Sequence, residues 1–106
     1  VVGPSVMIGF GGVHAEIVGD MAFRVAPFVE ADAIEAMESL RCAPMLGAYR
    51  GSSPADLPAI ARIMVAIGEI GTCVPGIAEM DLNPLVILPS GAPVAASALA
   101  VIEQGH

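Results

Sequence analysis

Apolar residues recur along the chain with two different spacings, one typical of strands and one typical of helices. Short apolar runs, several of which alternate with polar residues, predict strands over residues 5–9, 13–18, 21–26, 77–82, 85–88 and 94–98. Gly19 and Asp20 suit a tight turn between the second and third of these strands, because both tolerate a positive φ angle. The first quarter of the chain is therefore expected to hold a hairpin.

A three-residue recurrence of apolar positions predicts the first helix over residues 30–40. Ile34, Met37 and Leu40 fall on one side of it. Acidic residues fill the other side and the first turn, where the helix dipole favours negative charge. The segment is therefore expected to be amphipathic, with its apolar side in the core.

The second helix is expected over residues 57–71. Asp56 is a good N-cap, and Pro58 is tolerated because it falls in the first turn. The side that faces the core is expected to be an apolar stripe widened by two further isoleucines: Ile60, Met64, Ile67 and Gly71, with Ile63 and Ile70.

Strand hairpins that alternate with two helices indicate an α+β fold with a mostly antiparallel sheet. The 106 residues fit one domain, residues 1–106. The composition is 56% hydrophobic and 14% charged, whereas average chains are about a quarter charged. No apolar run approaches the roughly 18 residues of a membrane span. The apolar surface is therefore expected to pack against further protein, with this chain a fragment of a larger one.

The charge balance excludes some partners and leaves others open. The formal net charge is −7, with four arginines and no lysine, so the basic surface that a nucleic-acid backbone requires is missing. A nucleotide is compatible with this balance, because metal ions and a few arginines can hold phosphates. Cys42 and Cys73 lack metal-binding spacing and are expected to be buried thiols of a cytoplasmic protein.

The strongest candidate for chemistry is the segment EMDLNPL, residues 79–85. Strand alternation places Glu79, Asp81 and Asn83 on one side. Their oxygens are hard ligands of the kind that Mg²⁺ or Mn²⁺ prefers. Pro84 then removes a backbone donor and is expected to force the chain out of regular pairing. From spacing alone, a metal site and a solvated strand face remain equal alternatives.

A second candidate is the glycine cluster of residues 9–12, which precedes His14 and Glu16. Glycines before a strand can let a backbone approach a phosphate, although a tight connection between strands is the favoured explanation. Arg24 on the predicted hairpin and Arg50 in a glycine-flanked loop are candidates for contact with a phosphate.

Three blocks of the sequence resemble one family, in the same order. Residues 3–28, GPSVMIGFGGVHAEIVGDMAFRVAPF, resemble a family stretch that begins GPVVM and ends D-V-A-F-R-x-A-P. Residues 40–51, LRCAPMLGAYRG, resemble the next block, and residues 79–91, EMDLNPLVILPSG, resemble an E-x-D-x-N-P-L strand. Over nearly its full length the chain resembles the C-terminal half of the ATP-grasp fold of ADP-forming acyl-CoA synthetases.

The resemblance implies an acid–thiol ligase that uses ATP and Mg²⁺ as cofactors. In this family ATP, an acid and coenzyme A are interconverted with acyl-CoA, ADP and phosphate through a phosphohistidine. The resemblance implies that a CoA-binding and phosphohistidine domain or subunit is the partner, within a multidomain chain or hetero-oligomer. It also implies metal ligands, Asn83 and Asp81, and residues that line the nucleotide pocket, Gly11, Gly12, Glu16 and Asp81.

Two departures from the family pattern bear on activity. Ser97 stands where the family carries a second metal-binding aspartate, and a hydroxyl is a poorer Mg²⁺ ligand than a carboxylate. Gly19 replaces a family lysine. A degenerate, regulatory ATP-grasp module, for instance one fused to a protein acetyltransferase, is therefore an alternative. An unrelated interaction domain is a third.

Overall fold

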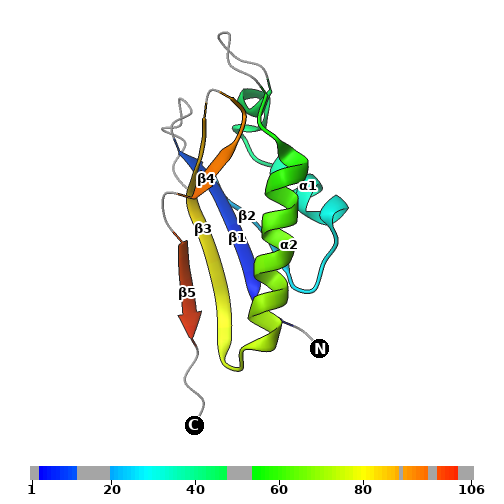
Figure 1. Cartoon of the computed structure of the whole chain (residues 1–106), viewed down its shortest axis with the longest axis vertical. Helices are drawn as coiled ribbons and strands as arrows, with labels where there is room; N and C mark the ends of the chain where they lie inside the picture. Colours follow the sequence, from blue (N-terminus) through cyan, green and yellow to red (C-terminus); the bar gives the residue numbers. More distant parts are fainter. Residues whose placement is uncertain (1–2, 12–19, 48–53, 89, 96–97, 103–106) are drawn as a thin grey trace.

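The computed structural model describes residues 3–11, 20–47, 54–88, 90–95 and 98–102. These residues form one five-stranded sheet with two α-helices and a short 3-10 helix (Figure 1). The elements are β1 (Ser5–Gly11), β2 (Ala22–Val25), α1 (Glu30–Glu38), η1 (Ala43–Leu46), α2 (Leu57–Cys73), β3 (Ile77–Ile87), β4 (Pro93–Ala95) and β5 (Ala98–Ile102). Within the described ranges, no helix is long and apolar enough to span a membrane.

The sheet is mostly antiparallel, as the sequence predicts. Its strand order is β2-β1-β3-β4, and β5 also pairs with β3. The pairs β1–β2, β3–β4 and β3–β5 are antiparallel, and β1–β3 is parallel. One edge of β3 therefore pairs with β1, while its other edge pairs with β5 along its first half and with β4 along its second half.

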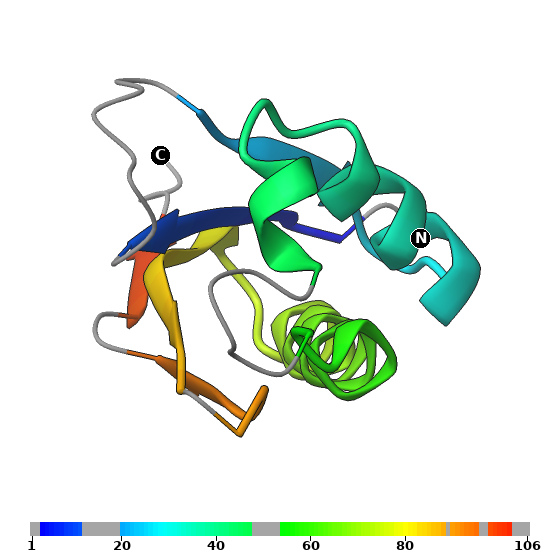
Figure 2. The same ribbon diagram turned by 90° about the horizontal axis from the view of Figure 1, so that it is seen from above.

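The parallel pair explains where the helices lie. Parallel strands cannot be joined by a tight turn, so the chain must cross over from the end of β1 to the start of β3. The crossover contains β2, α1 and α2. Both helices pack on the same side of the sheet, and the opposite side is left uncovered by them (Figure 2).

The core lies between the sheet and the two helices. Every second residue of β1, and the matching positions of β2 and β3, supply its sheet side: Val6, Ile8, Phe10, Ala22, Leu82 and Leu85. The helices supply the other side: Ala33, Ala36, Met37, Ile60, Ala61 and Met64. Apart from the buried Gly9, the residues between these strand positions are more exposed, which assigns them to the uncovered face.

The structure corrects the strand boundaries. The two strands predicted over residues 77–82 and 85–88 are one continuous strand, β3, whose register against β1 shifts by one residue near Asn83 and Pro84. The single strand predicted over residues 94–98 is wrong, because β4 and β5 are separate strands that pair with different parts of β3. The predicted strand over residues 13–18 lies outside the described residues.

Both helices lie where the sequence predicts them, but some residues predicted to face the core are exposed. The N-cap assignment is correct, since the Asp56 carboxylate accepts a hydrogen bond from the Ala59 backbone N–H at 3.0 Å. Ile63 and Ile70 were expected to widen the core stripe of α2, yet they are exposed to 38% and 57%. Cys73 is also exposed, whereas Cys42 is buried as expected.

The C-terminal part of α2 approaches the strand layer closely at Gly71. A Cβ atom at this position would overlap the ring of Pro4, which is itself fully buried. Because glycine lacks a Cβ atom, the helix can lie directly against the segment that leads into β1. This contact helps to fix the distance between α2 and the sheet.

Gly71→Ala is expected to lower the free energy of unfolding. Overpacking costs about 1–3 kcal/mol, which exceeds the roughly 1 kcal/mol gained from the helix propensity of alanine. Gly68→Ala is the matched control, since its Cβ would lie 3.1 Å from the Ala26 Cβ and needs only a small shift. Denaturant unfolding compares the two variants, and equal stability for both would contradict the close contact at Gly71.

Candidate functional site

The uncovered face of the sheet carries a row of polar residues on its central strand. Glu79, Asp81 and Asn83 alternate along β3 with residues on the helix side, such as the buried Leu82. Asp81 is flanked on both sides, because its register partners are Met7 on β1 and Leu99 on β5. The predicted common face of the three polar residues therefore agrees with the strand pairing.

Asp81 has an incomplete set of hydrogen bonds. Its Oδ1 atom is buried and has no hydrogen-bond partner among the described residues. A buried polar atom without a partner costs about 1–3 kcal/mol, and more when the group is charged. An oxygen in this state is suited to accept a metal ion or a donor from a bound molecule.

Asn83 is oriented by its neighbours across the sheet. Its Nδ2 atom donates a hydrogen bond to the Met21 Sδ atom at 3.3 Å. Its Oδ1 atom lies against the backbone of Gly9, where the Cβ atom of any other residue would come within 2.7 Å of it. Gly9 thus leaves the space in which the amide oxygen of Asn83 sits.

The two side chains fit a magnesium ion as part of its ligand set. Mg²⁺ is commonly bound by one or two protein groups, with waters and substrate phosphates as the remaining ligands. Asp81 and Asn83 supply two hard oxygen atoms on one face. Among the residues whose placement is described, no cluster of three or more His, Cys, Asp or Glu forms an all-protein metal cage.

The remaining predicted nucleotide-binding residues are only partly described. Gly11 ends β1 and pairs with Val86, so it lies at the same end of the sheet as Asn83. Gly12 and Glu16 lie outside the described residues, as does Ser97, where a second metal-binding acid was expected. Their roles remain predictions.

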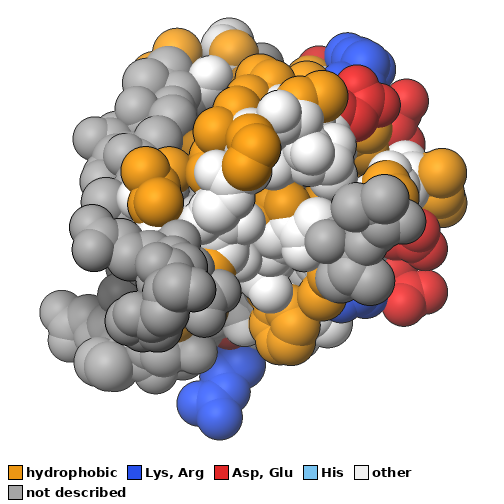
Figure 3. Space-filling view, turned by 90° about the horizontal axis from the view of Figure 1, so that it is seen from below, with side chains coloured by type: hydrophobic (Ala, Val, Ile, Leu, Met, Phe, Trp, Pro, Cys, Tyr) orange, Lys and Arg blue, Asp and Glu red, His pale blue; other side chains and the backbone are white. Residues whose placement is uncertain are grey.

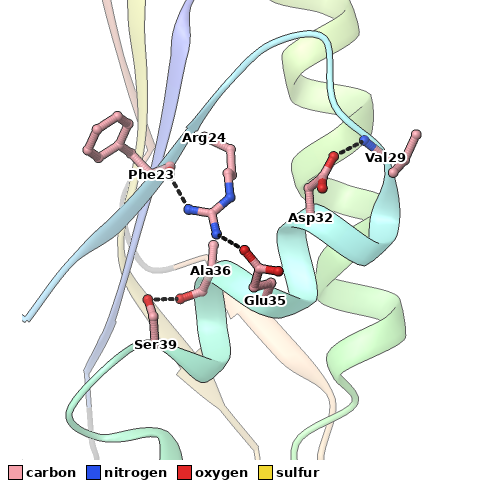
Figure 4. A network of polar contacts seen from close by, with 7 residues as sticks. All are labelled: Phe23, Arg24, Val29, Asp32, Glu35, Ala36 and Ser39. Carbon is pink, nitrogen blue, oxygen red and sulfur yellow. Dashed lines mark hydrogen bonds and ion pairs between the residues drawn. The ribbon is translucent and has the colours of Figure 1, made fainter.

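Arg24 is directed away from this face. Its guanidinium forms an ion pair with Glu35 of α1, with an Nη2–Oε1 distance of 3.1 Å, and donates to the Phe23 carbonyl (Figure 4). Arg24 therefore links β2 to α1 on the helix side of the sheet. The expected contact of Arg24 with a phosphate stays a prediction, and its guanidinium lies on the side of the sheet opposite the polar row of β3.

A hollow of about 620 Å³ lies elsewhere, between the end of α1 and the start of α2. Its walls are mostly apolar and include Met37, Leu40 and Leu46. None of the predicted site residues that the structure describes lines it. The hollow and the polar row of β3 are thus separate features.

Asp20 makes a contact that the sequence does not reveal. Its carboxylate accepts hydrogen bonds from the backbone N–H groups of Arg41 at 2.8 Å and Cys42 at 3.0 Å. These donors lie 21 and 22 residues further along the chain. Asp20 was expected only as a turn residue. Its carboxylate also connects the chain just before β2 to the segment that follows α1. An aspartate two residues before an edge strand is its only sequence signal.

The contacts around Asp20 shift the pKa values of two groups, its own carboxyl and the Cys42 thiol. Desolvation opposes its ionisation, but the N–H donors from Arg41 and Cys42 outweigh it, so the pKa of the Asp20 carboxyl lies below its usual value. Burial, together with the nearby Asp20 carboxylate, raises the pKa of the Cys42 thiol to about 12. Cys42 is therefore a protonated structural thiol at neutral pH.

Comparison with known proteins gives a consistent family signal. A profile of the ATP-grasp domain matches residues 1–102. The chain is 42% identical over 83 residues to the beta subunit of an ADP-forming acetate–CoA ligase I of Pyrococcus furiosus, covering 78% of this chain and 36% of that subunit. A trans-feruloyl-CoA synthase from an unknown prokaryotic organism is 42% identical over 104 residues, covering 96% of this chain and 15% of the synthase.

Solved structures show the same relationship. The chain superposes with a TM-score of 0.74, at 37% identity, on the dinucleotide-forming acetyl-coenzyme A synthetase 1 of Ca. Korarchaeum cryptofilum in complex with coenzyme A and Mg-AMPPCP. In that complex the phosphohistidine segment points towards the nucleotide-binding site. The match covers 93% of this chain and 46% of the other. The chain thus spans less than half of each of these three proteins.

Asp20→Ala is expected to lower the free energy of unfolding by about 1 kcal/mol near neutral pH, the usual size for a side chain that caps backbone N–H groups. The folded pKa of Asp20 is depressed, so its stabilisation is present above the unfolded value of 3.8 and is lost as the pH falls through the folded pKa. Denaturant unfolding over a pH series measures both effects.

Asp20→Asn is the control for this experiment, because it keeps one acceptor oxygen and removes the titrating charge. It should lose part of the stability near neutral pH and show no titration of its own. A difference between Asp20→Ala and the unchanged chain that stayed constant from neutral to acid pH would show that the Asp20 charge plays no part.

Proposed function

This chain belongs to the ATP-grasp domain family, and we propose that it is the part of an ADP-forming acyl-CoA synthetase that holds magnesium–ATP. Its relatives are ADP-forming acyl-CoA ligases. The proposed whole protein is an acid–thiol ligase in which the phosphoryl group of ATP passes to a histidine, giving ADP and a phosphohistidine, and in which a CoA thioester is formed from the acid.

One observation carries the proposal. The Oδ1 atom of Asp81 is buried and without a partner among the described residues, and it belongs to the same uncovered face as Asn83. A solvated strand face would leave both carboxylate oxygens in contact with water. The position of Asp81 instead suits a carboxylate whose partner is a bound ion or ligand.

The residues of this chain would bind and orient the reactants. Asp81 and Asn83 would hold Mg²⁺, directly or through an ordered water, while Gly9 leaves room for the Asn83 amide. Gly11, Gly12 and Glu16 are proposed to line the nucleotide. When bound, Mg²⁺ neutralises the negative charge that develops on the transferred phosphoryl group. The protein contributes position rather than covalent chemistry.

The proposed partners follow from the relatives. A structural relative contains a phosphohistidine segment that points towards its nucleotide-binding site, so we propose that a corresponding segment and a CoA-binding domain or subunit complete the site in the cytoplasm. The net charge of −7 supports a nucleotide held through a metal rather than a nucleic acid.

A second function, a regulatory ATP-grasp module without turnover, is favoured by one feature. Ser97 replaces the aspartate that the family pattern leads us to expect. With one carboxylate fewer, the magnesium affinity should be lower than in relatives that carry both acids. Such a module, for instance fused to a protein acetyltransferase, would bind nucleotide and signal its presence.

Asp81→Asn in the whole protein is expected to weaken magnesium-dependent ATP binding by at least about tenfold, because changes around a metal site commonly have effects of this size. Glu79→Gln is the matched control, since it removes an exposed carboxylate two residues away on the same face. Isothermal titration calorimetry with ATP at several Mg²⁺ concentrations measures both. An unchanged magnesium dependence in Asp81→Asn would rule out the proposed role of this carboxylate.

Ser97→Asp separates the two functions. If Ser97 occupies the second acid position, the variant should bind magnesium–ATP more tightly than the unchanged protein. Formation of acyl-CoA and ADP by the unchanged protein supports the ligase. ATP binding without acyl-CoA formation from short or aromatic acids, with turnover gained in Ser97→Asp, supports the regulatory module.

A further inference from the structure

Helix α2 carries exposed apolar residues beside its exposed polar ones, Arg62, Glu69 and Thr72, whereas most helices that face solvent expose mainly polar residues. Ile63, Ile70 and Val74 are exposed to 38%, 57% and 44%. Ala66 is also exposed and falls on the same side, because residues spaced by three, four or seven positions align along a helix. We call these residues, with the half-buried Ala59 and Ile67, the outer stripe of α2.

The outer stripe is left uncovered by the described elements. Figure 2 shows α2 nearly end-on, with α1 and the sheet on its inner sides and an open side away from them. Figure 3 shows hydrophobic side chains spread over one end of the molecule, with the acidic side chains gathered along a border. Because Ile63, Ile70 and Val74 are exposed, the outer stripe is an apolar surface that none of the described elements covers.

Two charges border the outer stripe with a regular spacing. Arg62 and Glu69 are both exposed and lie seven residues apart, so they occupy the same edge of the stripe one heptad from each other. Within the described ranges, neither takes part in an ion pair. One edge of the stripe therefore carries one positive and one negative charge, both exposed to solvent.

From this pattern we infer that α2 is the self-association surface of the protein, where it pairs antiparallel with α2 of a second copy. In an antiparallel pair, equivalent edges of the two helices meet. Arg62 of each copy then lies beside Glu69 of the other, and the two ion pairs are related by the twofold axis. The charge pattern of a single helix is complementary to itself in this arrangement.

The apolar side chains fit the same arrangement. When the two helices pair antiparallel in the register that joins Arg62 to Glu69, Ile63 faces Ala66 of the second copy and Ile70 faces Ala59. Each large side chain therefore meets a small one, as interdigitated packing requires. In a parallel pair, by contrast, Arg62 would meet Ile67 and Glu69 would meet Val74, which would leave both charges beside apolar groups.

The pairing is compatible with the proposed nucleotide site. The helices cover one face of the sheet, whereas Asp81 and Asn83 belong to the opposite face. Two copies joined through α2 would therefore keep both polar rows at the outside of the assembly. The inference does not depend on the identity of the nucleotide or on turnover.

Charge reversal in the whole protein tests the inference. Arg62→Glu and Glu69→Arg should each weaken the dimer by about tenfold or more, because two attractive pairs become repulsive. The double variant restores both pairs with their signs exchanged and should dimerise like the unchanged protein. Sedimentation velocity over a concentration series gives the dissociation constants. Glu38→Arg, an exposed reversal on α1, is the control and should change nothing.

A cross-linking experiment provides the second measurement. In a Cys73→Ser background, Ala66→Cys lies near the proposed twofold axis and should give dimers with a short bis-maleimide, whereas Thr72→Cys on another side of α2 should not. A monomeric unchanged protein, or a dimer that neither charge reversal weakens, would overturn the inference. Single reversals that weaken association without rescue by the double variant would instead show that another segment or subunit covers the stripe.

Discussion

The alternation of side chains along β3 is the constraint on which both the core and the candidate site depend. Leu82 and Leu85 turn one face of the strand into the core, and Asp81 belongs to the other face. Since β3 pairs with β1, β4 and β5, its register sets the positions of these three strands. A slip by one residue would exchange the two faces, burying carboxylates against the helices. Burial of the leucines therefore also fixes the direction of Asp81, and the register shift near Asn83 adjusts where the amide lies.

Helices on only one side of the sheet leave two surfaces of different character. The uncovered sheet face combines the polar row of β3 with exposed side chains of the edge strand, such as Phe23 and Val25. Such a mixed surface suits a nucleotide and its metal held against apolar walls. The outer stripe of α2 is different, because it is apolar throughout and bordered by two opposite charges. The same feature, an incomplete cover by the helices, underlies both the proposed ligand site and the proposed assembly surface.

The sequence predicts those parts of the structure that depend on local chemistry. Helix α2 begins where Asp56 can cap it, and the alternation of EMDLNPL places Asp81 and Asn83 on one face. Three features escape prediction because they depend on distant contacts. Periodicity shows that α2 is apolar but cannot show that Ile70 faces away from the core. The split of residues 94–98 depends on the two separate partners that β3 offers, and the donors to Asp20 lie more than twenty residues away.

The central claim is that the polar row of β3 holds the metal of a bound nucleotide. A crystal structure of the whole protein with Mg²⁺ and a non-hydrolysable ATP analogue tests it most directly. We expect Mg²⁺ on the uncovered face, with Oδ1 of Asp81 or Asn83 at about 2.0–2.1 Å from the ion or joined to it by one water. A nucleotide and metal bound elsewhere, with the Asp81 Oδ1 atom still unpartnered, would contradict the claim.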